Sequence, residues 1–234
     1  MKTVSAIARI GVFSAIILLF GCATFGLRFN VAIDSISLDS GAPKKTYVLL
    51  PGNKGVSADD LQFREFATYV ARALDSKGFV RASNTKKAEI VVFVSYGIGN
   101  PEQHIYSYSV AHYGETGISS ATTIGNTTYF QPSYGVTGYT SGVGSHTTFD
   151  RYMILDAYDV DAFEKNKRLI EIWKTTTTST GTSDDLRRVF PIMVAGAQPY
   201  LASNTGQKVR VVLSENNSAV KQIKSTFDVS ETKH

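Results

Sequence analysis

The stretch AEIVVFVSYGIG, residues 88–99, contains the strongest strand pattern in the chain. Its run Ile90–Phe93 is apolar at every position, so side chains on both faces of a strand would be apolar. Runs of this kind are typical of strands that lie inside a sheet with both faces covered. Residues 88–99 therefore predict a central strand that is covered on both sides.

A second strand and a helix precede this stretch. KTYVLLPGN, residues 45–53, indicates a strand over 46–50 that ends at the turn residues Pro51, Gly52 and Asn53. Ser57 with Asp60 three positions later predicts a helix N-cap, and Lys77-Gly78 predicts its end. The helical spacing is carried by Leu61, Phe66, Tyr69, Val70, Ala73 and Leu74.

The region after residue 150 continues the pattern of strands and one helix. RYMILDAYDV (151–160) and RLIEIWKTTTTST (168–180) predict two strands joined by a turn over 164–167 and paired as a hairpin. A helix is expected from Ser183, with a kink or break near Arg187 and Arg188 because Pro191 lacks an N–H group. QKVRVVL, residues 207–213, predicts a last strand. The fold class is therefore α+β, with a mixed, mostly antiparallel sheet packed by two main helices.

Residues 100–149 have a different composition. This segment is rich in Gly, Ser, Thr and Tyr and nearly free of charge, and residues 106–110 and 127–130 alternate as exposed hairpin strands do. It lacks the aliphatic residues of a core, so we expect a hairpin excursion that either covers the sheet or is partly mobile. The candidate binding surface consists of Tyr106, Tyr108, Tyr113, Tyr129, Tyr134 and Tyr139.

The N-terminus has the order of an export signal. Lys2 and Arg9 precede an apolar run from Ile10 to Phe20. Leu19-Phe20-Gly21-Cys22 resembles the lipobox of bacterial lipoproteins, which implies cleavage after Gly21 and attachment of lipid to the Cys22 thiol. Two alternatives stay open: an uncleaved transmembrane anchor over 10–27, and an ordinary secretory signal.

These patterns divide the chain into four parts. Residues 1–21 are a signal peptide, and residues 22–44 are a lipidated N-terminus and tether, in which Val31 and Ile33 would form one edge strand or a linker. A single α+β domain follows over 45–213 and includes the insertion 100–149. Residues 214–234 are expected to form a polar tail with a weak helix near 218–224.

The chain also resembles a known family over roughly residues 45–202. It is similar to the bacterial lipoproteins that share domain of unknown function 4136, through the stretches YVLLPGN, LQFREFATYVARALDSKGF, AEIVVFVSYGIG, YGVTGY and IWKTTTTSTGTSDDLRRVFPIMVAGAQPYL. The resemblance implies a compact α+β domain in the bacterial envelope, with no established activity and no accepted catalytic residues. Ala23 follows Cys22 where an Asp retains enterobacterial lipoproteins in the inner membrane, so an outer-membrane position facing the periplasm is expected.

The sequence offers little support for an enzyme or a nucleic-acid binder. It lacks G-x-S-x-G, H-E-x-x-H and Walker A patterns, and Cys22 is the only cysteine. His104, His112 and His146 would have to converge to bind a metal, so neither a metal nor another cofactor is expected. The net charge is +4 and no run of Lys or Arg exceeds two, so nucleic acid is not expected as a partner.

Three functional hypotheses remain. The first is a non-catalytic protein, anchored to the membrane through acylated Cys22, whose tyrosines stack on peptidoglycan or another glycan, or dock an envelope protein. The second is a structural subunit of an outer-membrane complex. The third is a metal-dependent or hydrolytic envelope enzyme.

Overall fold

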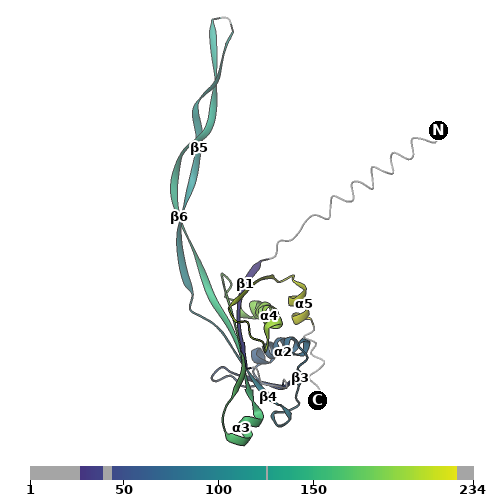
Figure 1. Ribbon diagram of the computed structural model, residues 1–234. Coiled ribbons are helices and arrows are strands. Elements are labelled where there is room, and N and C mark those ends of the chain that lie inside the picture. The colour runs from purple at the N-terminus through teal and green to yellow at the C-terminus, as the bar shows by residue number, and fades with distance from the viewer. Residues whose placement is uncertain (1–26, 39–43, 125, 226–234) are drawn as a thin grey trace, which may run out of the picture.

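The computed structural model describes residues 27–38, 44–124 and 126–225, and it confirms the α+β fold class (Figure 1). Its sheet contains β1 (Arg28–Ser37), β2 (Thr46–Pro51), β3 (Val80–Arg81), β4 (Ile90–Ile98), β5 (Glu102–Ile124), β6 (Thr127–Asp159), β7 (Glu171–Gly181) and β8 (Val209–Ser214). The helices are α2 (Leu61–Ser76), α3 (Val160–Asn166), α4 (Leu186–Ala197) and α5 (Ser218–Lys224), with short 3₁₀ turns η2 (Thr85–Lys87) and η3 (Gln198–Tyr200).

The sheet is mixed and mostly antiparallel, as predicted. Its strand order is β3-β2-β4-β6-β7-β1-β8, and β5 pairs with β6 outside this path. β2 runs parallel to β3 and β4, because α2 carries the chain back to the starting end of the sheet. All other pairs are antiparallel, including the predicted hairpin of β6 and β7.

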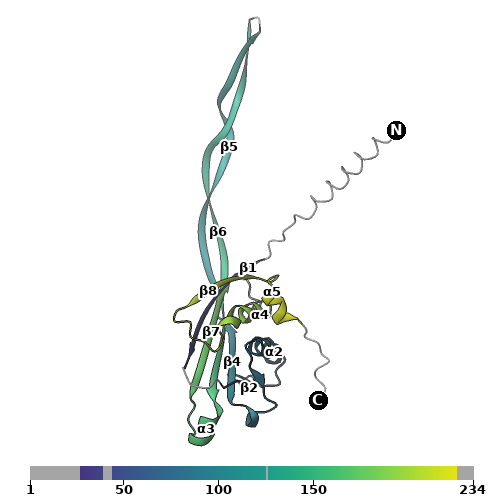
Figure 2. The same ribbon diagram turned by 45° about the vertical axis from the view of Figure 1, so that its right-hand side comes forward.

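The helices α2, α4 and α5 all lie on one face of the sheet (Figures 1 and 2). β4 is central, but its burial alternates: Ile90, Val92 and Val94 are fully buried, whereas Val91 and Phe93 are half-buried. The prediction that this strand is covered on both sides is therefore wrong. Antiparallel sheets tolerate one uncovered face, and neighbouring side chains such as Tyr158 beside Phe93 shield it in part.

Aromatic packing joins the two main helices to the sheet. Phe66 on α2 stacks on Phe190 of α4 with ring centroids 3.9 Å apart, and both rings meet the edge of Tyr96 on β4. Phe66 and Phe190 are both completely buried. This cluster fixes α2 and α4 against each other and against the sheet.

Both helix starts differ from the predictions. α2 is capped by Asp60, whose carboxylate accepts a hydrogen bond from the Phe63 amide at 2.9 Å, rather than by Ser57. α4 begins at Leu186 with Asp185 as its cap, not at Ser183, and it runs through Pro191 without the expected break. Pro191 lies in the second turn of a helix with a broad buried face, so packing offsets the one backbone hydrogen bond that it removes.

The folded domain begins before Lys45. β1 lies inside the sheet between β7 and β8, and Phe29, Val31 and Ile33 are buried beneath the helices. The interpretation of 22–44 as a tether is thus wrong for residues 28–37, and so is the alternative of an edge strand. A short alternating run becomes an inner strand only when partners lie on both sides, and these partners come from the other end of the chain.

The C-terminal part of the domain also extends further than predicted. α5 places Val220 and Ile223 in the core, and Arg72 of α2 donates a hydrogen bond from Nη1 to the Ile223 carbonyl at 2.6 Å. The predicted helix near 218–224 is confirmed as α5, but the interpretation of these residues as part of a polar tail is wrong, because Val220 and Ile223 are buried. The predicted turn over 164–167 is instead the helix α3, which ends at Lys167 in a left-handed conformation with φ 55°.

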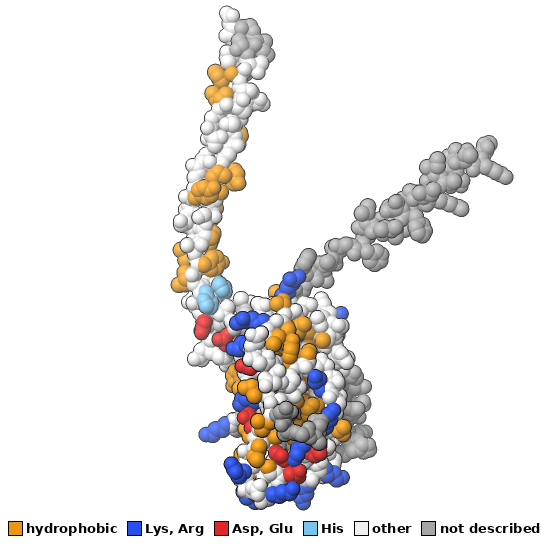
Figure 3. All heavy atoms as spheres, viewed as in Figure 1, with side chains coloured by type: hydrophobic (Ala, Val, Ile, Leu, Met, Phe, Trp, Pro, Cys, Tyr) orange, Lys and Arg blue, Asp and Glu red, His pale blue; other side chains and the backbone are white. Residues whose placement is uncertain are grey.

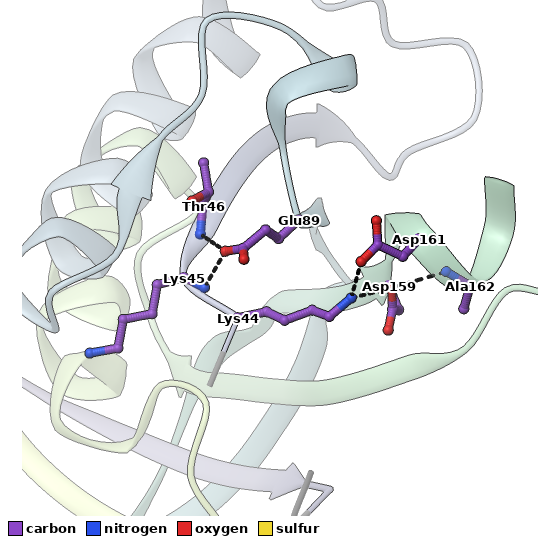
Figure 4. A network of polar contacts seen from close by, with 7 residues as sticks. All are labelled: Lys44, Lys45, Thr46, Glu89, Asp159, Asp161 and Ala162. Carbon is purple, nitrogen blue, oxygen red and sulfur yellow. Dashed lines mark hydrogen bonds and ion pairs between the residues drawn. The ribbon is translucent and has the colours of Figure 1, made fainter. Parts of the chain in front are cut away.

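A polar network fixes the start of β2 beside the end of β6 (Figure 4). Lys44 Nζ lies 2.7 Å from Asp159 and 2.9 Å from Asp161, and Glu89 accepts backbone N–H bonds from Thr46 at 2.8 Å and Lys45 at 2.9 Å. These amides lower the pKa of Glu89. Burial alone would raise the pKa of Asp159, but the Lys44 and Ala162 hydrogen bonds outweigh it and lower the pKa.

This network predicts a loss of stability in acid. A carboxylate whose pKa is lowered in the folded state stabilises the fold above its unfolded pKa of about 4, and that contribution disappears as the pH falls through the folded value. The free energy of unfolding should therefore fall between about pH 5 and about pH 3, and it should fall less in Glu89→Gln. Urea unfolding at several pH values measures this, with exposed Glu164→Gln on α3 as control. An equal pH dependence in both variants would contradict the prediction.

Candidate interaction site on the β5–β6 hairpin

The segment 102–148 forms a two-stranded antiparallel ribbon, which we call the arm (Figures 1 and 2). Glu102 pairs with Thr148 at its base and Ile124 with Thr127 near its tip, and β6 enters the main sheet only at Phe149. The 23 residues of β5 give the arm a length of roughly 75 Å. The predicted hairpin excursion is confirmed, but it extends away from the sheet instead of covering it.

The arm is almost free of charge. It contains two carboxylates, Glu102 and Glu115, and none of the chain's 24 Lys and Arg residues. In Figure 3 the Lys and Arg side chains are scattered over the rest of the described domain, here called the body, whereas the arm shows apolar and neutral groups and, near its base, histidine. The arm therefore offers little charge through which electrostatic attraction could act.

The distal half of the arm has two different faces. Residues paired across an antiparallel ribbon share a face, and side-chain contacts agree with the register. Tyr134 donates a hydrogen bond to Glu115 at 3.1 Å on one face, while Thr116 meets Ser133 at 3.1 Å on the other. Three register shifts, between 112 and 113, 115 and 117, and 118 and 120, displace the alternation along the sequence but leave the faces separate.

One of these faces, here called the apolar face, carries most of the large side chains. Tyr113 is 78% exposed, Tyr134 and Tyr139 are 70% exposed, and Ile118 and Phe130 are 62% exposed. The opposite, polar face carries small and polar groups apart from Val110, which is 46% exposed. The apolar face consists of Ala111, Tyr113, Ile118, Ala121, Phe130, Pro132, Tyr134, Val136 and Tyr139, with Glu115 among them; the polar face includes His112, Gly114, Thr116, Ser120, Gln131, Ser133, Gly135 and Thr140.

The six predicted tyrosines do not form one surface. Tyr113, Tyr134 and Tyr139 belong to the apolar face, and the side chain of Tyr129 lies outside the described part of the chain. Tyr106 and Tyr108 lie near the base, on the face that continues into the polar face, and are about half exposed. Their rings lie across the neighbouring strand.

Two glycines make room for these basal rings. A Cβ at Gly142 would come within 2.6 Å of the Tyr108 ring, and a Cβ at Gly144 within 2.7 Å of the Tyr106 ring. Glycine on one strand with an aromatic ring laid over it from the next is a known stabilising pair in ribbons. Tyr106 and Tyr108 thus serve the structure of the ribbon, which the sequence prediction did not separate from binding.

The three histidines do not converge on one point. His104 and His146 are directly paired and their rings stack at 5.1 Å, whereas His112 lies further along β5 and contacts Thr140. In the ranges that the structure describes, no group of three or more His, Cys, Asp or Glu residues could hold a metal ion. None of the described helices combines the length and apolar character that a membrane crossing requires. Gly21, Cys22 and the rest of residues 1–26 lie outside the described residues.

Sequence reasoning missed Ile118, Phe130 and Val136 as members of the candidate surface. Phe130 and Val136 share a face with Tyr134 by two-residue alternation along β6, and Val136 is paired with Tyr113, whereas Ile118 joins this face through the register shifts on β5. The usable signal was the absence of Lys and Arg from 100–149, which marks the whole segment as unlike an ordinary solvent-exposed loop.

Two solved structures resemble this chain, both with low sequence identity and a low TM-score. A DUF4136 family protein from Bacteroides thetaiotaomicron VPI-5482 is 16% identical, with a TM-score of 0.33 over 72% of this chain and 91% of its own. A PDZ domain protein from Parabacteroides distasonis ATCC 8503 is 12% identical, with a TM-score of 0.37 over 81% of this chain. The matched region spans 40% of the length of that PDZ domain protein. No protein-family model and no curated protein matches the sequence.

Proposed function

We propose that this chain is a non-catalytic lipoprotein of the bacterial envelope, anchored through acylated Cys22, which binds an envelope partner with its arm. The stretches between residues 45 and 202 listed above support membership of the lipoprotein family with domain of unknown function 4136. The observation that carries the binding role is the exposed apolar face of the arm, which packs against nothing in the described domain.

Exposure of the apolar face to water is unfavourable for an arm of this kind. An isolated two-stranded ribbon is only marginally stable in water, and contiguous exposed apolar surface usually marks an interaction site. The buried core consists of residues from the body alone, so the rings of the arm do not contribute to it. A partner that covers the apolar face would stabilise both the ribbon and the complex.

The position of the anchor supports an envelope partner. Thr178 of β7 pairs with both Ala32 and Tyr152, so Arg28 at the start of β1 lies at the end of the sheet from which the arm leaves. Cys22 is six residues before Arg28, a distance that the chain spans with about 20 Å at most. A lipid on Cys22 would therefore hold the base of the arm near the membrane surface.

Intact mass of the membrane-extracted protein tests the anchor. A chain that begins at Cys22 and carries the added mass of acyl groups is expected, because two or more acyl chains are needed for stable membrane binding. A chain that begins at Met1 without modification would overturn the lipoprotein assignment in favour of the transmembrane alternative.

Photo-crosslinking in living cells tests the binding role. A photoreactive amino acid at Tyr113 or Tyr134 should give adducts with envelope components, whereas the same group at Thr116 or Thr140 on the polar face should give at least ten-fold less. Equal yields from the two faces would contradict binding through the apolar face. Co-sedimentation with isolated peptidoglycan, compared between the wild type and Tyr113→Ser/Tyr134→Ser, separates a glycan partner from a protein partner.

A further inference from the structure

The distal arm offers two kinds of surface, and its strand edges are the less suitable one. Each strand of the arm pairs with one other strand, so its outer edge is open in the described structure. The distal half nevertheless contains three bulges together with Pro132, which lacks an N–H group. Bulges and proline are the features by which natural proteins prevent further strands from adding to an edge. The apolar face is therefore the surface of the distal arm that is suited to binding a partner.

The apolar face is large enough for a stable interface. Its six largest side chains are between 41% and 78% exposed and present roughly 800 Å². A standard protein–protein interface also buries about 800 Å² on each partner. Tyrosine, the commonest large residue on this face, is enriched at such interfaces. The large residues are Tyr113, Ile118, Phe130, Tyr134, Val136 and Tyr139.

The position of Glu115 argues against lipid as the covering layer. It lies among the apolar residues and accepts a hydrogen bond from Tyr134 at 3.1 Å. The arm contains no Lys or Arg that would neutralise this carboxylate in hydrocarbon. The open backbone edges would also lack partners there, because lipid tails offer no hydrogen bonds. A protein surface leaves the edges in water and brings additional hydroxyl groups to Glu115.

We propose that two copies of this chain pack their arms together, the apolar face of one against the same face of the other, in a twofold-symmetric dimer. This inference rests on the proposed binding role of the arm. Two faces that are apolar and rich in tyrosine complement each other except at Glu115, where each face carries one carboxylate that accepts a hydrogen bond from Tyr134. Tyrosine hydroxyl groups of the second copy would supply further hydrogen bonds to this carboxylate, which hydrocarbon cannot do. Anchors in one membrane also raise the concentration at which the two arms meet.

Cysteine crosslinking in native membranes tests the dimer. Single substitutions on the apolar face (Tyr113→Cys, Ile118→Cys, Tyr139→Cys) are compared with matched ones on the polar face (Thr116→Cys, Ser120→Cys, Thr140→Cys) in the full-length protein, with a short bis-maleimide as the reagent. Crosslinked dimers from at least one apolar-face position, at ten-fold or greater yield than from any polar-face position, are expected. Equal yields from the two faces, or no dimer from any position, would overturn the proposal.

Neighbouring residues on β6 supply a charge control. Phe130→Asp puts a carboxylate on the apolar face, whereas Gln131→Asp puts one on the polar face at the next position. Combined with the best apolar-face cysteine, Phe130→Asp should lower the dimer yield at least ten-fold, and Gln131→Asp should leave it within two-fold. Equal far-ultraviolet circular dichroism spectra of the two variants, which include the signal of the β5–β6 ribbon, together with equal thermal unfolding, exclude misfolding as the cause. An equal effect of both substitutions would contradict face-to-face packing.

The outcomes separate this inference from the proposed function. If no dimer forms while Tyr113 still photo-crosslinks to one defined envelope protein, the dimer is wrong and the binding role stands. If neither a dimer nor a partner is found, both are wrong. If the cysteine of Ile118→Cys is shielded from a water-soluble maleimide only in phosphatidylethanolamine–phosphatidylglycerol vesicles and no dimer forms, the face belongs to lipid and the dimer is overturned.

Discussion

Replacing Phe190 with alanine is expected to lower the free energy of unfolding by about 4 kcal/mol. The ring is completely buried, stacks on Phe66 at 3.9 Å and meets the edge of Tyr96 at 5.8 Å. Alanine loses the transfer free energy of the ring and leaves a cavity between α4, α2 and the sheet, where three rigid elements cannot close around it. Urea unfolding followed by the fluorescence of Trp173, the only tryptophan, measures the loss.

Two further variants define this effect. Phe163→Ala on α3, where the ring is 44% exposed, should cost less than about 1 kcal/mol. A double-mutant cycle of Phe66→Ala and Phe190→Ala should show a coupling of about 1 kcal/mol, because each ring is the stacking partner of the other. A loss below about 1.5 kcal/mol for Phe190→Ala would mean that the packing of α4 differs from that described.

Replacing Arg151 with alanine is the second change expected to have a large effect, about 3–4 kcal/mol. The Arg151 side chain is 1% exposed beneath the helix layer. It donates hydrogen bonds from Nε to the Ser179 carbonyl at 3.0 Å, from Nη1 to the Ser183 carbonyl at 2.8 Å and from Nη2 to the Ser179 hydroxyl at 3.3 Å. Burial lowers the pKa of the guanidinium group. Alanine would leave these acceptors unpaired. It would also remove the hydrogen bonds that join Ser179 on β7 to Ser183 in the segment leading to α4.

The geometry of Arg151 predicts that lysine cannot replace it. Three nitrogens of the guanidinium fork reach acceptors on two residues, whereas one ammonium group would have to choose among them. Arg151→Lys should therefore recover less than half of the loss, while Arg210→Ala on the exposed side of β8 should change stability by less than about 0.5 kcal/mol. Full recovery by lysine would contradict the proposed role of the fork.

Most helices and strands outside the arm could be predicted from the sequence. The element type was predicted correctly for three segments: the helix over 61–76, the strand that contains the apolar run 90–93, and the hairpin of 151–160 with 168–180. Each of these segments has a strong hydrophobic pattern of its own. Errors fell where the decisive contact is distant in sequence. Residues 28–37 became an inner strand because β7 and β8 flank them, and residues 218–224 joined the core because α2 and α4 leave apolar surface beside them.

The candidate surface was predicted in composition but not in geometry. The tyrosines and the absence of basic residues identified segment 100–149, yet Tyr106 and Tyr108 proved to cover glycines, while Ile118, Phe130 and Val136 joined the exposed face. Strand register decides this division, because a shift of one residue moves a side chain to the opposite face. Register depends on how two strands align over their whole length, and the bulges that set it have no strong local signal.

Local chemistry in the sequence therefore determined the two main helices, most of the strands and the segment that carries no basic residues. Tertiary structure decided that α2, α4 and α5 lie on one face of the sheet, that residues 28–37 form an inner strand, and that the arm leaves the same end of the sheet as Arg28. The physical reason is the same in each case: burial and strand pairing are gained between segments that are far apart in the chain, so no local pattern contains them.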